Sequence, residues 1–381
     1  MRAERASPGD KAWACLYGSV VDGQVNNEQP NTEPDMIEKL NVIQAMMAIL
    51  GASAVAITAM EGVLIGRKAG REPYDWRAFW TTVRINLWRV VVEAIPMGVV
   101  LGASLPFGAW MYEQRLWTVP MDTWWGWVAM FFCTEFFYYW MHRAGHRIRW
   151  YWASHQVHHS GNQYNLAAAF RQSITGKVTG GFVFFAPQCL LGFSPDAVLI
   201  SYGLNLVYQF WIHTDMVPKL GWMEGVFNTP SAHRVHHAAN VEYLDCNYGG
   251  TIMLFDRLFG TYVEEKDGVP IRYGLVKSQT SYTALWVLLA EWVAIGRDLL
   301  KVRNPLHALG YLFGPPGWAP HGKGLTTEGL REKMKQLTGE AAGAPPEWLL
   351  DGKPAPEGMP GAAPARSEAQ PDRQSAGLSR A

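Results

Sequence analysis

The sequence has few cysteines and few charged residues for its 381 residues. The four cysteines lie far apart, which argues against a disulfide framework and against a C-x-x-C metal site. Charged residues make up 17% of the chain, against about 25% in ordinary soluble proteins. Lys+Arg and Asp+Glu both number 33, so the formal net charge is zero. Because nucleic acid binding requires a basic face, this balance argues against a nucleic acid partner.

The sequence also lacks the motifs of an internal electron-transfer module. There is no C-x-x-x-x-C-x-x-C ferredoxin spacing and no glycine-rich nucleotide fingerprint after a strand. The histidines outside the main cluster, His307 and His321, have no context typical of haem ligands, and we expect them to be structural or surface residues. Any redox chemistry is therefore expected to draw its electrons from a separate partner.

Long apolar runs predict an all-α, multi-pass membrane protein. A bilayer span takes about 20 apolar residues, and the chain has three long runs and two shorter ones: Val42–Ile65, Val90–Trp110, Trp124–Met141, 176–192 and 195–212. The last two form either a full hairpin or a pair that only partly crosses. Ala284–Ile295 is too short to span and is expected to lie at the membrane interface. Trp124, Trp125 and Trp127 are typical of an interfacial aromatic belt.

Basic residues set the expected orientation. They gather at 66–89 and at 142–175, whereas the loop at 112–123 has a single arginine. The positive-inside rule then places the basic loops in the cytoplasm and the N-terminus outside. With five spans, the histidine-rich part of the chain forms a helical cap on the cytoplasmic face. Residues 1–40 have no apolar core and do not resemble a cleavable signal peptide.

These patterns predict five segments. They are a polar N-terminal segment (1–40), membrane-spanning helices (41–119), a catalytic domain (120–265), an interfacial or cytoplasmic region (266–340) and a tail (341–381). Ala, Gly and Pro make up 22 of the 41 tail residues, a composition that predicts disorder.

Nine of the eleven histidines fall between residues 142 and 237. Eight form one H-x-x-x-H and two H-x-x-H-H clusters, and a ninth follows the predicted fifth span: His142, His146; His155, His158, His159; His233, His236, His237; and His213. On a helix, positions i, i+3 and i+4 share one face, so each cluster is expected to present two or three rings in a single direction. Eight or nine imidazoles are too many for one zinc, which takes four ligands. The pattern predicts two metals, and iron, copper and zinc all suit imidazole.

Polar residues near these clusters are candidates to support the metal ligands. Glu135 lies within the third predicted span, seven residues before His142, and is expected to accept the ring N–H of a metal-binding histidine. Asn247 is the second candidate for a catalytic role. Asp215, Asn228 and Asp245 are further candidates for hydrogen bonds to the ligands.

The motifs resemble those of the fatty acid hydroxylase (sterol desaturase) superfamily of membrane di-iron oxygenases, over roughly residues 120–265. Within this superfamily the motifs are most similar to those of the alkylglycerol monooxygenase branch and its bacterial sterol-desaturase-like relatives. Five segments carry this similarity: EFFYYWMHRAGH, HQVHHSGNQYNLAAAFRQS, YQFWIHT, NTPSAHRVHHAAN and NYGGTIMLFDRLFGTY. Glu135 stands where relatives often carry Asp, and Ala232 stands where some carry His.

The resemblance implies two irons held by the eight motif histidines, with His213 matching a further family histidine. It also implies dioxygen and a lipid as substrates, and hydroxylation of a lipid C–H bond of alkylglycerol, sterol or fatty acyl type. The electron donor would be a reductase, a ferredoxin, a b-type cytochrome or a reduced pterin. The Ala-, Arg- and Gly-rich composition favours a bacterial inner membrane, with the endoplasmic reticulum as the alternative.

Other functions remain open at this stage. A sterol or acyl desaturase begins with the same hydrogen abstraction, and no sequence feature separates it from a hydroxylase. A membrane metal transporter would place its ligands within the spans, whereas these clusters lie beyond the span ends. A haem electron carrier would need only isolated histidine pairs.

Overall fold

The computed structural model describes residues 53, 55–67, 72–176, 178–322, 324–353 and 356. Most of the predicted first span, Val42–Ile65, and the segment 1–40 lie outside this part. Residues 55–67 are helical. For residues 90–105 the backbone is described as helix.

Three long helices carry the first half of the fold. α3 (Trp76–Glu113) begins at Asp75, whose side chain accepts a hydrogen bond from the Ala78 backbone N–H. The N-cap of α4 (Trp124–Arg147) is Thr123, whose side-chain oxygen accepts a hydrogen bond from the Gly126 backbone N–H. The chain becomes extended at Ile148, and α5 (Arg149–His159) starts immediately after it. This corner folds α5 back against α4.

The segment predicted as the fourth span is not one helix. It divides into η2 (Gly181–Phe184) and α6 (Ala186–Leu190), with Gly180 in the left-handed region and Pro187 at the start of α6. The turn to α7 (Pro195–Trp211) uses Gly192, where a side chain would collide with the Trp117 carbonyl. The two predicted shorter runs are therefore a broken segment and one helix of 17 residues.

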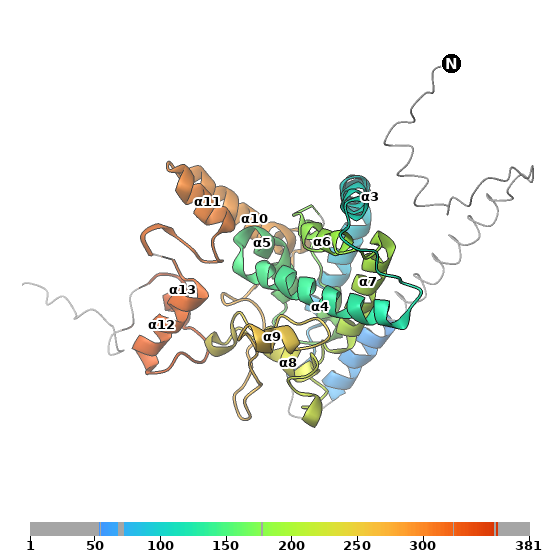
Figure 1. Cartoon of the computed structure of the whole chain (residues 1–381). Helices are drawn as coiled ribbons and strands as arrows, with labels where there is room; N and C mark the ends of the chain where they lie inside the picture. Colours follow the sequence, from blue (N-terminus) through green and yellow to red (C-terminus); the bar gives the residue numbers. More distant parts are fainter. Residues whose placement is uncertain are drawn as a thin grey trace, which may run out of the picture.

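The second half consists of short helices and loops, followed by a helical C-terminal part. Its elements are η3 (Gly221–Met223), α8 (Pro230–His236), η4 (Val241–Tyr243), α9 (Leu254–Leu258), α10 (Ala284–Lys301), α11 (Pro305–Phe313), η5 (Pro320–Gly322), α12 (Thr327–Thr338) and α13 (Glu347–Leu350), while η1 (Leu166–Phe170) precedes η2. Figure 1 shows α4 across the middle of the molecule, with α8 and α9 on one side and α5, α6 and α10 on the other.

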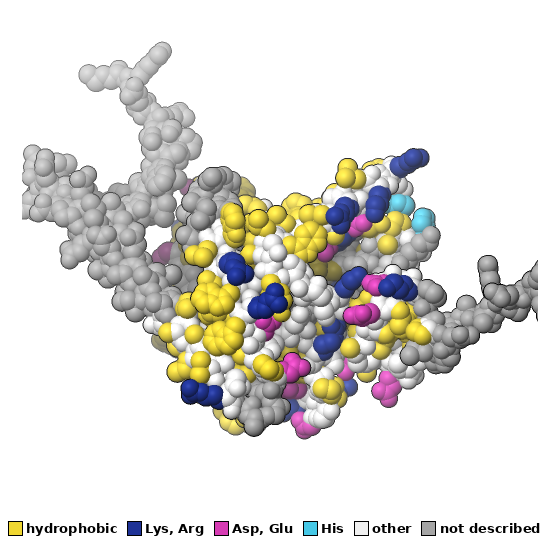
Figure 2. Space-filling model, turned by 180° about the vertical axis from the view of Figure 1, so that it is seen from behind, with side chains coloured by type: hydrophobic (Ala, Val, Ile, Leu, Met, Phe, Trp, Pro, Cys, Tyr) yellow, Lys and Arg dark blue, Asp and Glu magenta, His cyan; other side chains and the backbone are white. Residues whose placement is uncertain are grey.

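The described part of the chain is helical, and its only β contacts are isolated bridges. Within it, no helix combines the length and the apolar character that crossing a bilayer requires. Many large apolar side chains are nevertheless exposed, among them Leu87 on α3, Trp124 on α4 and Val207 on α7. Figure 2 shows hydrophobic side chains spread over the face seen from behind.

Two apolar clusters join the C-terminal region to the rest. Ile85 of α3 and Val157 of α5 pack against α10, through Val287 and Leu288. The beginning of the segment predicted to be a disordered tail is also packed. Leu349 of α13 is buried together with Val241, Leu330 and Met334. The tail prediction was therefore wrong for residues 341–353, because their few apolar side chains have a ready surface on α12 and η4. Residues from 357 onward lie outside the described part.

Candidate metal centre

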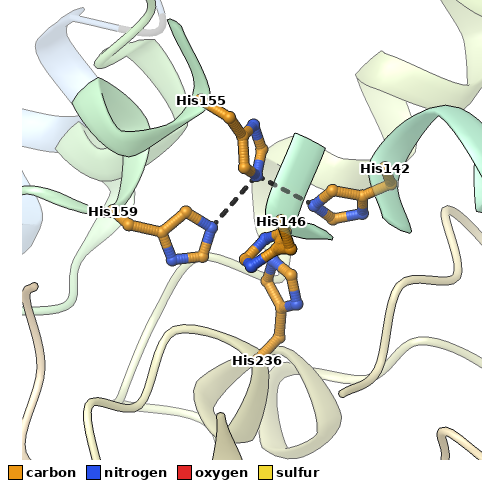
Figure 3. Close-up of side chains that lie close together, drawn as sticks. All are labelled: His142, His146, His155, His159 and His236. Atoms are coloured by element: carbon orange, nitrogen blue, oxygen red, sulfur yellow. Dashed lines mark hydrogen bonds between the residues drawn. The ribbon is translucent and has the colours of Figure 1, made fainter. Parts of the chain in front are cut away.

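All nine clustered histidines meet in the interior, although they come from four separate elements. Their ring nitrogens form two groups, and within each group the potential ligand atoms lie within 4.8 Å of one another. One group has five members, His142, His146, His155, His159 and His236, and the other has four, His158, His213, His233 and His237. Figure 3 shows the five-histidine group with rings from α4, α5 and α8 turned toward a common centre.

The helical repeat explains how the clusters divide. In His155-x-x-His158-His159, the i and i+4 residues join the five-histidine group and the i+3 residue joins the other. In the α8 cluster, His233 and His237 join the four-histidine group and His236 joins the five-histidine group. Positions i+4 and i+3 lie about 40° and 60° to opposite sides of position i. Each cluster therefore turns two of its rings toward one group, while the i+3 ring of each H-x-x-H-H cluster joins the other group.

Backbone carbonyls fix the orientation of four of the rings. Nδ1 of His142 lies 2.9 Å from the Tyr248 carbonyl oxygen, and Nδ1 of His158 lies 3.0 Å from that of Ala168. Nδ1 of His213 is 2.6 Å from the Gln209 carbonyl oxygen. Nδ1 of His236 is 2.9 Å from the Cys246 carbonyl oxygen. A carbonyl only accepts, so each Nδ1 carries the proton and each Nε2 presents its lone pair to the centre of its group.

The lone pairs fit a bound cation. Nε2 of His213 and Nε2 of His158 are 3.2 Å apart, and neither carries a proton to donate to the other. The Nε2 atoms of His146, His236 and His237 are buried without a hydrogen-bond partner. With metal–nitrogen bonds of about 2.0–2.1 Å, neighbouring ligand nitrogens lie roughly 3.0–3.4 Å apart. The donor set and its spacing therefore match a metal in each group.

Burial keeps these rings in the form that binds metal. Desolvation lowers the pKa of His142 and of His213 to about 4. Desolvation, reinforced by neighbouring histidines, lowers the pKa of His146 and His237 well below the usual value of about 6.5. All nine side chains are consequently neutral at pH 7, as metal ligation requires.

A cavity of about 680 Å³ reaches both groups. His142, His155, His158 and His213 lie in its wall at one end. Much of the remaining wall comes from η2, α7 and the segments beside them, and includes Phe182, Phe185, Val198, Leu199, Leu206 and Phe210. Polar side chains also line it, among them Arg89, Ser154, Gln172, Ser173 and Thr179. Its size is typical of a site for a small organic ligand, and its wall suits an apolar chain passing the metal groups.

Glu135 does not accept a proton from any of the nine histidines. Oε1 accepts a hydrogen bond of 2.5 Å from Asn205 Nδ2, while Oε2 accepts from the backbone N–H groups of Thr251 (2.9 Å) and Ile252 (3.1 Å). The expected contact with a metal-binding histidine was therefore wrong. The carboxylate instead joins α4 to α7 and to the loop that follows Tyr248. Asn205 in turn accepts from Gln209, whose carbonyl orients His213.

Asn247 also lies behind the histidines and touches none of them through its side chain. Its Nδ2 donates to the carbonyls of Ala232 (3.0 Å) and Val263 (2.8 Å), and its Oδ1 accepts from the Val263 N–H. Its positive φ of 55° is tolerated by asparagine. Asn247 thus fixes α8 against residues 261–263, which is a structural role in place of the predicted catalytic one.

The other supporting candidates lie at different distances from the rings. Asn228 Nδ2 is 3.4 Å from His233 Nδ1 and donates to the Gly249 carbonyl at 2.7 Å. Asp245 Oδ1 is 3.8 Å from His146 Nδ1, and its other oxygen pairs with Arg147 at 2.7 Å. Asp215 lies near Tyr164, whose pKa is raised by burial and further by the charge of Asp215. His307 and His321 face one another and belong to neither group.

Comparison with known proteins identifies this part of the chain. Residues 127–261, which include all nine histidines, match the fatty acid hydroxylase family model. This segment is therefore similar to fatty acid hydroxylase domains. The match lies inside the segment 120–265 that carries the sequence resemblance. No solved structure matches the chain.

The same part of the chain has curated relatives in animals and bacteria. The chain is 39% identical over 228 residues to alkylglycerol monooxygenase of Xenopus tropicalis, covering 60% of this chain and 50% of the relative. It is 35% identical over 251 residues to the human enzyme of the same name, covering 66% and 55%. It is 24% identical over 179 residues to an ornithine lipid hydroxylase of Rhizobium tropici, covering 47% and 53%. The chain thus spans about half the length of these curated relatives.

Several residues that build the candidate metal centre were not predicted from the sequence. The carbonyls of Tyr248, Ala168, Gln209 and Cys246 orient ligand rings, but every residue has a carbonyl, so the sequence carries no signal for them. Arg234, inside the third histidine cluster, is also missed. The available signal in the sequence was an arginine placed between two histidines of a ligand motif.

Proposed function

We propose that this protein is a membrane-bound di-iron monooxygenase that uses dioxygen to hydroxylate a C–H bond of a lipid of alkylglycerol, sterol or fatty acyl type. The observation that carries the proposal is the meeting of two buried histidine groups at one end of a largely apolar cavity of about 680 Å³. The fatty acid hydroxylase match and the lipid-oxidising relatives support the same reaction.

In this proposal the five-histidine and four-histidine groups hold one iron each. Bound iron supplies the activation of dioxygen that an unreactive C–H bond requires. The protein would hold both irons through neutral rings, and in His142, His158, His213 and His236 the Nδ1 proton is committed to a backbone carbonyl. It thereby fixes the ligand nitrogens before the substrate arrives.

The cavity residues orient the lipid and exclude water. Phe185, Leu199 and Leu206 contact the apolar chain, and the cavity brings that chain alongside His142 and His158. Because most of the exposed wall surface is apolar, it offers water fewer hydrogen-bond partners than bulk solvent does. An aqueous side reaction at the metals is disfavoured for the same reason.

The membrane and the electron donor belong to the proposal as well. The exposed apolar side chains of α3, α4 and α7 suit contact with lipid tails. The basic residues at 66–89 and 142–175 favour a cytoplasmic position for the histidine groups, and the proposal includes a bacterial inner membrane as the location. A separate reduced ferredoxin, b-type cytochrome or pterin supplies the electrons.

Comparative lipid analysis tests this proposal. Cells with and without the protein are grown under ¹⁸O₂, and their lipids are compared by mass spectrometry. A hydroxylase gives a protein-dependent lipid product that carries one ¹⁸O atom. A product that has lost two hydrogens and gained no label would identify a desaturase. Identical lipids in both cultures would contradict oxidation of a cellular lipid by this protein.

A further inference from the structure

Arg234 is a buried arginine between two histidines of the metal groups. It lies on α8, one residue after His233 and two before His236, and is 6% exposed. Its guanidinium Nε and Nη2 donate to the Glu265 carboxylate, with the shortest contact at 2.7 Å. The carboxylate holds the pKa of Arg234 above its usual value despite the cost of burial.

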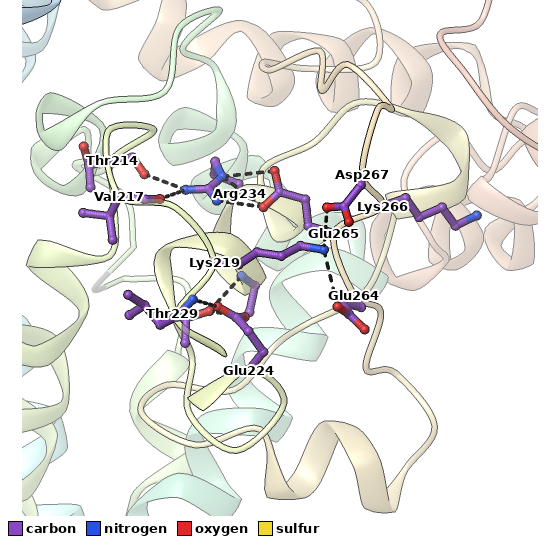
Figure 4. A network of polar contacts seen from close by, with 12 residues as sticks. Thr214, Val217, Lys219, Glu224, Thr229, Arg234, Glu264, Glu265, Lys266 and Asp267 are labelled. Atoms are coloured by element: carbon purple, nitrogen blue, oxygen red, sulfur yellow. Dashed lines mark hydrogen bonds and ion pairs between the residues drawn. The ribbon is translucent and has the colours of Figure 1, made fainter. Parts of the chain in front are cut away.

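The other arm of the same guanidinium holds the chain that carries His213. Nη1 donates to the carbonyl of Thr214 at 3.3 Å and to that of Val217 at 2.7 Å. Thr214 directly follows His213. Figure 4 shows Arg234 at the junction of three segments, α8, residues 214–217 and residues 264–267. One planar side chain therefore sets the separation between His233 and His213, whose Nε2 atoms are 3.0 Å apart.

The two histidine groups depend on this junction unequally. Four of the five residues in the five-histidine group come from α4 and α5, which pack against each other through their shared corner. The four-histidine group takes one residue from α5, one from the end of α7 and two from α8. Only the second group needs α8 and residues 213–217 to be held at a fixed distance.

We propose that Arg234 is the positioning residue of the four-histidine metal site, and that it acts by clamping the His213 segment to α8 with Glu265 as its counter-ion. Loss of the clamp opens the gap between His213 and His233 and weakens metal binding there. The five-histidine site keeps its α4 and α5 ligands. This inference rests on the proposed two-metal function.

Replacing Arg234 by methionine tests the clamp, because methionine keeps the length and apolar stem without the fork. The readout is the affinity of the full-length protein in detergent for each of two cobalt(II) ions, followed by visible absorption. We expect affinity for one ion to fall about 10- to 100-fold, the usual cost of losing a group that supports metal ligands. The residual spectrum should match that of His233→Ala and differ from that of His146→Ala. Arg234→Lys, which keeps the charge, should recover part of the affinity.

Lys219→Gln is the matched control, since Lys219 lies in the same network but forms solvent-exposed ion pairs with Glu264 and Asp267. It should bind two cobalt ions with unchanged affinity. Wild-type affinity at both sites in Arg234→Met would overturn the proposal, as would equal weakening of both sites. Wild-type protein that binds fewer than two ions would instead contradict the proposed function itself.

Discussion

Hydrogen-bond partners on the far side of the buried imidazole rings orient these rings for metal binding. Where Nδ1 is committed to a carbonyl, as in His142 and His213, the lone pair on Nε2 has a fixed direction. Such hydrogen bonds also raise the basicity of the ligand. Backbone carbonyls, rather than carboxylates, therefore accept the Nδ1–H hydrogen bond of most of the rings whose partners are described.

Removing a single ring tests the ligand assignment. In His158→Ala, the four-histidine group loses one ligand and the His213 lone pair loses its neighbour. We expect metal content to fall from two toward one per chain and turnover of the lipid substrate to fall at least about 100-fold. His307→Ala serves as the control, because His307 pairs with His321 away from both groups, and should leave both quantities unchanged. Full activity in His158→Ala would remove that residue from the ligand set.

Glu135 makes a different prediction, since its oxygens accept from Asn205 and two backbone N–H groups rather than from a ligand. In Glu135→Gln, an amide NH₂ replaces one carboxylate oxygen. It then faces a hydrogen-bond donor, which is either the Asn205 amide or the backbone N–H groups of Thr251 and Ile252. The free energy of unfolding should fall by about 1–3 kcal/mol, while the protein still binds two metals. Thermal unfolding in detergent and metal analysis measure the two effects. Loss of metal without loss of stability would contradict this account and support the contact between Glu135 and a metal-binding histidine that was predicted from the sequence.

The lowered histidine pKa values predict how stability depends on pH. In the folded, metal-free chain the pKa values of His142 and His213 are about 4, whereas in the unfolded chain they are about 6.5. The unfolded chain takes up protons first, so stability is full above pH 6.5 and falls as the pH drops toward 4. The unfolding temperature of the metal-free protein should be lower at pH 5 than at pH 7.5 and should recover on return. An equal unfolding temperature at both pH values would contradict the buried, neutral rings.

At the scale of elements, the corner at Ile148 is what makes a five-membered group possible. It turns α5 back so that His155 and His159 face His142 and His146. The helical repeat then directs His158 to the other group. The corner and the 3.6-residue turn thus account for how α4 and α5 share their rings between the two groups, while α8 and His213 complete them.

Helix α13 makes an element-scale prediction about the C-terminus. Leu349 packs with Val241, Leu330 and Met334. Ending the chain after residue 356 should leave the unfolding temperature and metal content unchanged. Ending it after residue 340 should lower the free energy of unfolding by about 2–5 kcal/mol, the usual cost of losing a buried leucine. Leu349→Ala isolates that contact. Equal stability of the two truncated chains would contradict the packing of α13.

For the whole molecule, the sequence was sufficient to find the nine histidines, because their spacing is local. It was not sufficient to divide them, since the two groups depend on how α5 and α8 meet. The partners of Glu135 and the clamp at Arg234 depend on contacts between residues far apart in the chain. From the sequence, residues 176–192 were predicted to be one continuous apolar segment. The break was missed because a hydropathy average does not register Gly180 and Pro187.

The proposed monooxygenase function requires two irons, one within each histidine group beside the lipid cavity. Anomalous diffraction at the iron edge, on crystals of the protein purified from detergent, measures this directly. The account predicts two peaks, one among His142, His146, His155, His159 and His236 and one among His158, His213, His233 and His237. A single peak, or no iron peak in a metal-loaded protein, would contradict it.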